Sequence, residues 1–171
     1  LQDGELERLD KLAQTAVLTS QGIPFLWVGE EVMRDKKGVH NSYNSPDSIN
    51  QIDWSLKAKN EDLFRYYQGL IALRKAHPAF RLGDAELVRK HMHFLDAPQG
   101  VVAYVLTDHA GGDAWQDIVV VLNSNREAVT INLPDGKFTA VCADGQFTDD
   151  ANKTYEKKAT VAPQTALILH D

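Results

Sequence analysis

The first part of the chain combines a helical hydrophobic pattern with a strand-like one. Between Glu5 and Thr19 the apolar residues recur every three or four positions: Leu6, Leu9, Leu12, Ala13, Ala16 and Val17. This spacing predicts an amphipathic helix, which Gly22 would end. Residues 23–28 are then continuously apolar, which indicates a strand buried on both faces, as in a parallel sheet. Pro24 suits only the start of such a strand, because proline has no N–H to donate.

A long polar stretch and a second helix follow. Residues 34–60 are rich in Asn, Ser and charged side chains, which is typical of a loop. Asn60 is placed to cap the next helix, which His77 and Pro78 would end. A strand buried on both faces needs parallel neighbours to complete its hydrogen bonds, and the pattern predicts none nearby. We therefore expect residues 1–80 to be an incomplete α/β segment.

Residues 81–171 show strand patterns only. Turn signals such as Asp135–Gly136 and Asp144–Gly145 separate seven candidates. We expect the strands at residues 86–95, 101–108, 117–123, 127–133, 137–143, 155–161 and 165–170. Seven short strands at this spacing predict an antiparallel β-sandwich, which would be a second domain over residues 81–171.

Composition and charge exclude several classes of protein. The 171 residues include 18 Lys and Arg and 24 Asp and Glu, a net charge of −6. An acidic chain without a basic cluster is not expected to bind nucleic acid. The chain has no apolar run of the ~20 residues that a membrane helix needs, so no membrane segment is expected. Its single cysteine, Cys142, lies in an apolar strand and is expected to be a small core residue. The charged helical pattern at the start is unlike a signal peptide, and we expect the chain to be part of a longer protein.

The end of the predicted 23–28 strand is the most informative position for chemistry. In parallel α/β folds, functional groups collect at the carboxyl ends of strands. Glu30 and Glu31 stand there, before an unusually long loop. Consecutive residues of an extended chain point to opposite sides, so these two carboxylates are not expected to flank one glycosidic bond.

The loop carries side chains of the kind that sugar-binding sites use. Amide and carboxylate groups bridge sugar hydroxyls, and aromatic faces stack on pyranose rings. Such groups are provided by Asn41, Tyr43, Asn44, Asp47, Asn50 and Trp54. Asn, Ser, Pro and Asp are also ordinary turn formers, so spacing alone leaves both interpretations open.

The chain offers no self-sufficient catalytic or metal motif. His91 and His93 would share one face of a strand, but two imidazoles without a third ligand make a poor metal site. Residues 144–150 lack a glycine and a final glutamate at the offsets that a calcium loop requires. Phosphate-binding loops, nucleophile-elbow serines and HExxH are absent from the sequence. We therefore expect no catalytic residue, no metal site and no cofactor within this chain.

Two stretches resemble a known enzyme family. Residues 22–31 match the pattern G-x-P-x-x-x-x-G-x-E at Gly22, Pro24, Gly29 and Glu31. This pattern is similar to the eighth barrel strand of the α-amylase superfamily. Residues 37–54, KGVHNSYNSPDSINQIDW, resemble the loop after that strand in type I pullulanases, the bacterial debranching enzymes.

The resemblance implies a fold and an activity. The chain would be the C-terminal portion of such an enzyme: the end of a (β/α)8 barrel in residues 1–80, then an antiparallel β-sandwich C-terminal domain. Family members cleave α-1,6-glucosidic linkages in pullulan and amylopectin by a retaining mechanism. Their catalytic carboxylates lie on the fourth, fifth and seventh barrel strands and match no position here. The implied partners are the α-glucan polysaccharide substrate and the missing N-terminal part of the same enzyme.

The resemblance also suggests substrate-binding residues. Asp47 and Asn50 match loop positions that the family places near its glucan subsites, and Tyr43 and Asn44 are further candidates. Trp27 departs from the His or Tyr that is common at its position. Glu31 would brace the barrel end and take no part in the reaction.

Two other functions compete with this one. The chain could be a non-catalytic carbohydrate-binding module, or a structural module that associates with the rest of the enzyme. The sequence leaves the compartment open among extracellular, cell-surface and cytoplasmic locations.

Overall fold

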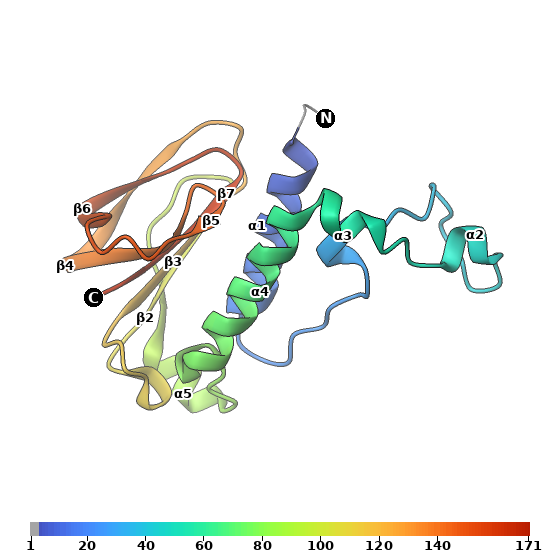
Figure 1. Ribbon diagram of the computed structural model, residues 1–171. Helices are drawn as coiled ribbons and strands as arrows, with labels where there is room; N and C mark the ends of the chain where they lie inside the picture. Colours follow the sequence, from blue (N-terminus) through green and yellow to red (C-terminus); the bar gives the residue numbers. More distant parts are fainter. Residues whose placement is uncertain (1–3) are drawn as a thin grey trace.

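A helical layer packs on one side of a curved antiparallel sheet, and a loop arm projects away from both (Figure 1). The computed structural model describes residues 4–171. Two long helices, α1 (Glu5–Thr19) and α4 (Glu61–Ala76), lie against each other between the sheet and the arm. The short helical elements are η1 (Glu30–Val32), α2 (Asp47–Asn50), α3 (Ser55–Lys59), η2 (Pro78–Phe80), α5 (Ala85–His91) and η3 (Ala110–Gly112).

Both long helices confirm the sequence prediction. Helix α1 has the bounds that the hydrophobic period predicts, and α4 ends just before His77 and Pro78. The predicted capping role of Asn60 is wrong, because its side chain makes no cap hydrogen bond. The Nδ2 atom of Asn60 instead donates to the carbonyls of Val32 at 2.9 Å and Leu56 at 3.1 Å. Helix α3 ends directly before Asn60, so its free C-terminal carbonyls compete for this side chain.

Within residues 4–171, seven strands form one antiparallel sheet. They are β1 (Met92–Phe94), β2 (Val101–Leu106), β3 (Ile118–Asn123), β4 (Val129–Ala143), β5 (Gln146–Phe147), β6 (Thr154–Val161) and β7 (Thr165–His170). Their order is β1-β2-β3-β7-β4-β5, and β6 pairs with β4. The antiparallel pairing expected of the strands in this part of the chain is confirmed.

Two details of the strand prediction are wrong. The predicted strand 86–95 begins as helix α5, because the Asp84 carboxylate accepts from the backbone N–H groups of Glu86 at 2.8 Å and Leu87 at 3.1 Å. This is an ordinary N-cap. The predicted strands 127–133 and 137–143 form the single strand β4. Asp135–Gly136 does not reverse the chain there; the pairing with β6 only shifts register between Asn132 and Lys137.

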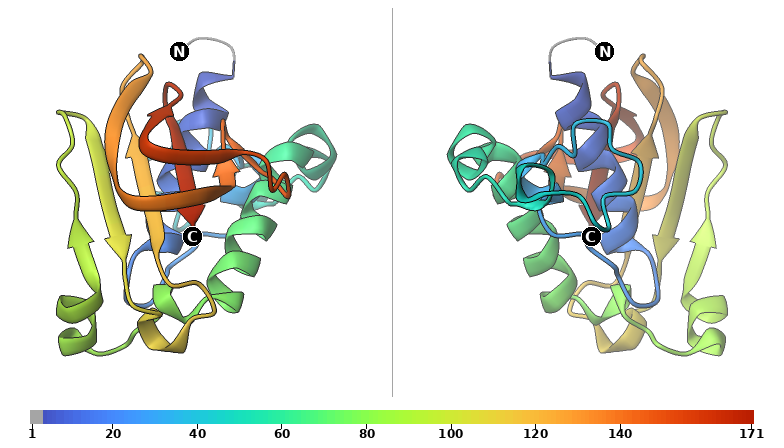
Figure 2. Two further views of the ribbon diagram at one scale, coloured as in Figure 1. Left: turned by 90° about the vertical axis from the view of Figure 1, so that its left-hand side faces the viewer. Right: turned by 90° about the vertical axis from the view of Figure 1, so that its right-hand side faces the viewer.

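The sheet is buried on both faces. One core cluster joins the helices to the sheet and includes Tyr66, Leu70, Tyr104, Val120 and Ile168. The second lies on the opposite face and is made by Val119, Val121, Ile131, Phe138, Leu167 and Leu169. Residues of both β3 and β4 thus contribute to it, and Figure 2 shows the strong curvature of the sheet. The two layers expected of a sandwich therefore belong to one continuous sheet.

Residues 23–28 do not form the predicted buried strand. The segment is unpaired, and the side chains of Ile23, Phe25 and Trp27 are 99%, 77% and 55% exposed. Every strand pair within residues 4–171 is antiparallel and lies in the distant sheet, so this segment has no parallel neighbour to pair with. A strand needs such a neighbour for its backbone hydrogen bonds.

One further finding concerns membranes. Across residues 4–171, no helix has both the length and the apolar character needed to span a bilayer.

Candidate functional site

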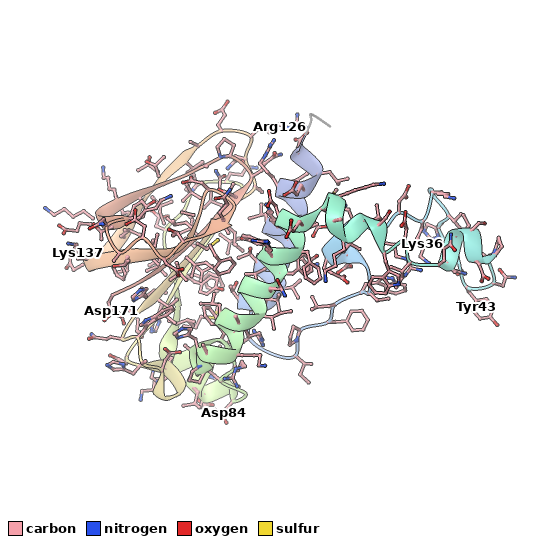
Figure 3. All side chains as sticks on the ribbon, in the orientation of Figure 1. Lys36, Tyr43, Asp84, Arg126, Lys137 and Asp171 are labelled. Atoms are coloured by element: carbon pink, nitrogen blue, oxygen red, sulfur yellow. The ribbon has the colours of Figure 1, made fainter. Side chains whose placement is uncertain are left out.

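The loop arm between η1 and α3 carries all four predicted substrate-binding residues. It extends away from the helical layer, and Lys36 and Tyr43 mark it in Figure 3. A surface hollow of about 460 Å³ lies on the arm. Its walls are formed by Trp27, Lys36, Val39, His40, Asn41, Ser42, Tyr43 and Asn50. The hollow therefore combines aromatic rings with amide groups.

Three of the four predicted substrate-binding residues are exposed: Tyr43, Asn44 and Asp47. The Tyr43 side chain is 90% exposed, and its backbone N–H donates to Oδ1 of Asn41 at 3.2 Å. Asp47 begins helix α2 and is exposed, as is Asn44. Tyr43 and Asn50 line the same hollow, whereas Asp47 and Asn44 lie outside its walls.

Asn50 is held by several hydrogen bonds within the arm. Its Nδ2 atom donates to the carbonyls of Ser42 and Ser45, both at 2.8 Å. Its Oδ1 atom accepts from Nζ of Lys36 at 2.7 Å. The Arg34 guanidinium donates to the backbone carbonyl of Asn50. Asn50 thus joins both sides of the loop.

The two consecutive glutamates are engaged in the local backbone. Both lie in η1, a 3-10 helix, and not in the extended backbone that the sequence suggested. Glu30 accepts from Nε2 of Gln14 at 3.0 Å, and Glu31 accepts from the backbone N–H of Gly29 at 2.8 Å.

Asp10 and Tyr67 lie next to these glutamates. The Tyr67 hydroxyl donates to Oδ1 of Asp10 at 2.7 Å. Burial raises the pKa of Asp10; the Tyr67 hydrogen bond opposes this, and the negative charges of Glu30, Glu7 and Glu31 add to it. Burial also raises the pKa of Tyr67, and its bond to Asp10 acts in the same direction. This group forms a hydrogen-bonded junction between α1, η1 and α4.

The structure separates the two histidines that were considered as metal ligands. His91 ends helix α5, is buried, and has its Nδ1 atom 2.8 Å from the carbonyl of Thr107. His93 is exposed on β1, with its Nε2 atom 3.1 Å from the carbonyl of Lys90. Because His91 is helical, the strand period that would align the two rings does not apply. Residues 4–171 contain no group of three or more His, Cys, Asp or Glu that could hold a metal ion.

Cys142 confirms its prediction as a core residue. It is fully buried, and its Sγ atom lies 3.3 Å from the hydroxyl of Tyr66. Burial raises the pKa of the Cys142 thiol to about 11.

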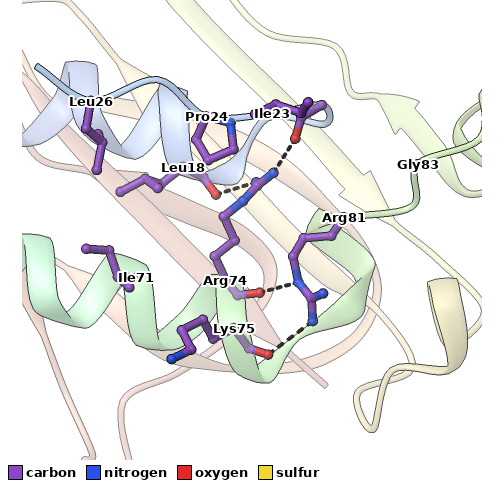
Figure 4. Close-up of a pocket in the computed structure, with 10 residues that line it drawn as sticks. Leu18, Ile23, Pro24, Leu26, Ile71, Arg74, Lys75, Arg81 and Gly83 are labelled. Atoms are coloured by element: carbon purple, nitrogen blue, oxygen red, sulfur yellow. Dashed lines mark hydrogen bonds between the residues drawn. The ribbon is translucent and has the colours of Figure 1, made fainter.

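The structure also contains an apolar groove that the sequence did not predict. A groove of about 760 Å³ runs between residues 22–26 and helix α4, with walls that include Leu18, Leu26 and Ile71 (Figure 4). At its end Arg74, only 6% exposed, donates to the carbonyls of Leu18, Ser20 and Gly22 at 2.8, 2.7 and 2.6 Å. The sequence feature that could have indicated this buried arginine is its spacing: Arg74 comes four residues after Leu70 and therefore lies on the buried face of α4.

Comparison with known proteins gives a consistent family. The family described as "Pullulanase, all-beta domain" matches residues 88–146. The pullulanase of Bacillus subtilis (strain 168) is 38% identical over 161 residues, which cover 94% of this chain and 22% of that protein. Pullulanase A of Streptococcus pneumoniae serotype 2 is 28% identical over 75% of this chain and 14% of its own length.

Solved structures agree with these relatives. The pullulanase from Bacillus acidopullulyticus superposes with a TM-score of 0.93 at 40% identity, over 96% of this chain and 20% of that one. The pullulanase type I from Bacillus subtilis str. 168, complexed with maltose, gives a TM-score of 0.94 at 36% identity, over 99% of this chain and 24% of that one. The chain spans 22% of the length of the first of these curated relatives and 14% of the second. By sequence and by fold, it belongs with the pullulanases, as the counterpart of their C-terminal portion.

Proposed function

We propose that this chain is the C-terminal part of a pullulanase-type glycoside hydrolase that cleaves α-1,6-glucosidic linkages in pullulan- and amylopectin-type glucans. It completes the catalytic (β/α)8 barrel, presents the arm to the glucan and supports the barrel with its sheet. The catalytic carboxylates belong to the N-terminal part of the same enzyme, which is the chain's partner. The observation that carries this proposal is the exposed, unpaired apolar segment 23–28 beside an apolar groove.

The segment has the properties of a strand without its neighbours. Ile23, Phe25 and Trp27 are each more than half exposed, and Leu26 lines the groove against α4. Burying a large apolar side chain contributes about 2 kcal/mol, so leaving three in water is costly. Parallel strands on either side would cover these side chains and pair the free backbone groups at the same time. This is the role that the eighth strand of a barrel has.

The sheet supplies the support. Tyr66 and Leu70 of α4 share a core cluster with Tyr104 and Val120 of the sheet. Glu5 at the start of α1 is buried and accepts from Nε of Arg126 at 2.9 Å. Through these contacts, residues 81–171 hold α1 and α4 in place. We propose that the two helices close the barrel on the side that faces away from the sheet, so that residues 1–80 and 81–171 act as two domains.

The arm provides the contact with glucan. Tyr43, Asn44 and Asp47 are exposed on it, and Tyr43 and Asn50 line its hollow. Solved relatives from Anoxybacillus sp. LM18-11 carry maltotriose and maltotetraose. We propose that the arm contacts α-glucan chains at the rim of the barrel.

A chimera tests the proposal. This chain would replace the matching C-terminal segment of the Bacillus subtilis pullulanase, and release of reducing sugar from pullulan would be measured. We expect the chimera to hydrolyse pullulan, whereas the 171-residue chain alone and the truncated enzyme do not. Phe25→Asn in the chimera should strongly reduce the activity, because it places an amide where the barrel would bury an aromatic ring. Lys90→Met, at an exposed position on α5 outside the walls of the groove, should leave the activity unchanged. Hydrolysis by the isolated chain would contradict the proposal.

The hollow also favours a second candidate, a non-catalytic carbohydrate-binding module. In that case the isolated chain would bind maltotetraose in calorimetry, and Tyr43→Ala or Asp47→Ala would weaken the binding. An inactive chimera combined with tight binding by the isolated chain would favour this alternative.

A further inference from the structure

The side chain of Asn50 has no free N–H group. A carboxamide has two N–H donors, and both donate to backbone carbonyls, those of Ser42 and Ser45. The opposite assignment of the amide would place Oδ1 against two carbonyl oxygens and Nδ2 against the Lys36 ammonium. The orientation is therefore determined by the partners themselves. A sugar hydroxyl that needs a donor would not find one at Asn50.

These bonds hold the turn that carries Tyr43. The backbone N–H of Ser45 donates to the carbonyl of Ser42 at 3.0 Å, which closes a four-residue turn over residues 42–45. Asn50 joins both ends of this turn to helix α2. Tyr43 itself is 90% exposed, so packing of its own ring does little to hold it.

The base of the arm holds Asn50 in turn. Arg34 donates to its backbone carbonyl and Lys36 to its side-chain oxygen. The same Arg34 side chain also donates to the carbonyl of Val28 at 3.3 Å, next to Trp27 in the wall of the hollow. A connected set of hydrogen bonds therefore runs from residue 28 through Asn50 to the turn.

We propose that Asn50 is a positioning residue: it holds the 42–45 turn so that Tyr43 borders the hollow, and it affects glucan binding through that turn and not by contact. This inference rests on the proposed function, because it takes the ligand of the hollow to be an α-glucan. It assigns the contact with sugar to Tyr43 and its exposed neighbours on the turn.

Hydrogen exchange in the 171-residue chain tests the first half of the inference, without ligand. Asn50→Asp keeps the shape and the acceptor for Lys36 but loses both donors. We expect the amide of Ser45 to exchange at least tenfold faster, while amides in the middle of α1 and the thermal midpoint stay unchanged. Asp47→Asn is the matched control on the same helix and should leave exchange at Ser45 unaltered. Unchanged exchange in Asn50→Asp would overturn the inference.

A double-mutant cycle tests the second half. The Kd for maltotetraose would be measured for the parent chain, Asn50→Asp, Tyr43→Ala and the double variant. A positioning residue gives non-additive effects: Asn50→Asp weakens binding about tenfold when Tyr43 is present and less than twofold when it is absent. Additive losses would mean that Asn50 contacts glucan directly, which would overturn the inference.

The exchange and binding measurements test the two halves of the inference independently. If the parent chain binds no maltotetraose, the glucan role of the isolated arm fails, and the exchange experiment still decides whether Asn50 holds the turn. If Asn50→Asp does not fold, Lys36→Met provides the second variant. It leaves both Asn50 donors in place, so a turn held by those donors should show a rise in exchange at Ser45 of less than threefold. A tenfold rise would locate the restraint at Lys36 and overturn the role of Asn50.

Discussion

Replacing Arg74 by methionine is expected to destabilise the chain by about 3 kcal/mol. The guanidinium donates to the carbonyls of Leu18, Ser20 and Gly22 at 2.6–2.8 Å. Figure 4 shows the bond to Leu18. The last turn of α1 has no basic residue of its own. Arg74 of α4 therefore supplies the positive charge that favours the negative end of the α1 dipole, and it also pairs carbonyls that helix ends leave free.

The magnitude follows from two opposing effects. A hydrogen bond to a charged group contributes about 1.5–3 kcal/mol, so three bonds would sum to about 4.5–9 kcal/mol. That sum is too large, because methionine also avoids the cost of burying a guanidinium. Burial lowers the pKa of Arg74, with the charge of Arg81 acting in the same direction, which is a sign of that cost. A buried acceptor left without a partner costs about 1–3 kcal/mol, and water can reach the exposed residues 20 and 22, so we expect a net loss of about 3 kcal/mol.

Urea unfolding followed by circular dichroism measures the effect. With an m-value of about 2 kcal/mol per molar urea, a loss of 3 kcal/mol lowers the midpoint by about 1.5 M. Arg74→Lys should have an intermediate effect, since one ammonium cannot reproduce the planar fork of a guanidinium. Lys75→Met, at the adjacent exposed position, should change stability by no more than about 0.5 kcal/mol. Equal midpoints for Arg74→Met and Lys75→Met would refute the argument that Arg74 anchors residues 18–22.

Two further predictions concern titrating groups. The pKa of Cys142 rises from 9.0 to about 11, which makes its thiolate about a hundredfold rarer at pH 8. A thiol reagent should therefore label the native chain very slowly and the guanidinium-unfolded chain rapidly. Fast labelling of the native chain would contradict this prediction. The pKa of Asp10 is raised above its ordinary 3.8, so the folded state keeps this proton longer than the unfolded state, and stability should fall as pH rises from about 4 through the folded-state pKa. Asp10→Asn keeps an acceptor for Tyr67 and should reduce that fall. If the Tm of the two proteins changes with pH in parallel between pH 4 and 7, the assignment to Asp10 is refuted.

Local sequence patterns determined the long helices well. The bounds of α1 follow from apolar residues spaced at the period of a helix. Helix α4 ends before Pro78 because proline has no backbone N–H to continue the helix. Helix α5 was missed although its cap at Asp84 is equally local, because the apolar and β-branched residues after it suggested a strand. Such short segments carry both patterns, and local preferences alone do not decide between them.

Strand prediction failed where pairing decides the structure. Asp135–Gly136 has the sequence of a hairpin turn, yet β4 continues through it because β6 pairs with residues on both sides. The exposure of Tyr43 and Asp47 was predictable from their place in a polar loop, whereas their contact with a sugar stays a prediction. The hydrogen-bonding role of Asn50 was not predictable, because its partners become neighbours only when the arm folds back.

The sequence by itself determined the two long helices, the run of strands and the resemblance to pullulanases, because these depend on local periods and on short motifs. The tertiary structure decided three other features: the curvature that makes one sheet serve as both layers, the anchoring of α1 by Arg74, and the unpaired state of residues 23–28. Each of these depends on whether backbone groups find partners far away along the chain. No local pattern specifies such a partner, because a hydrogen bond between distant residues forms only when the rest of the fold brings its donor and acceptor together.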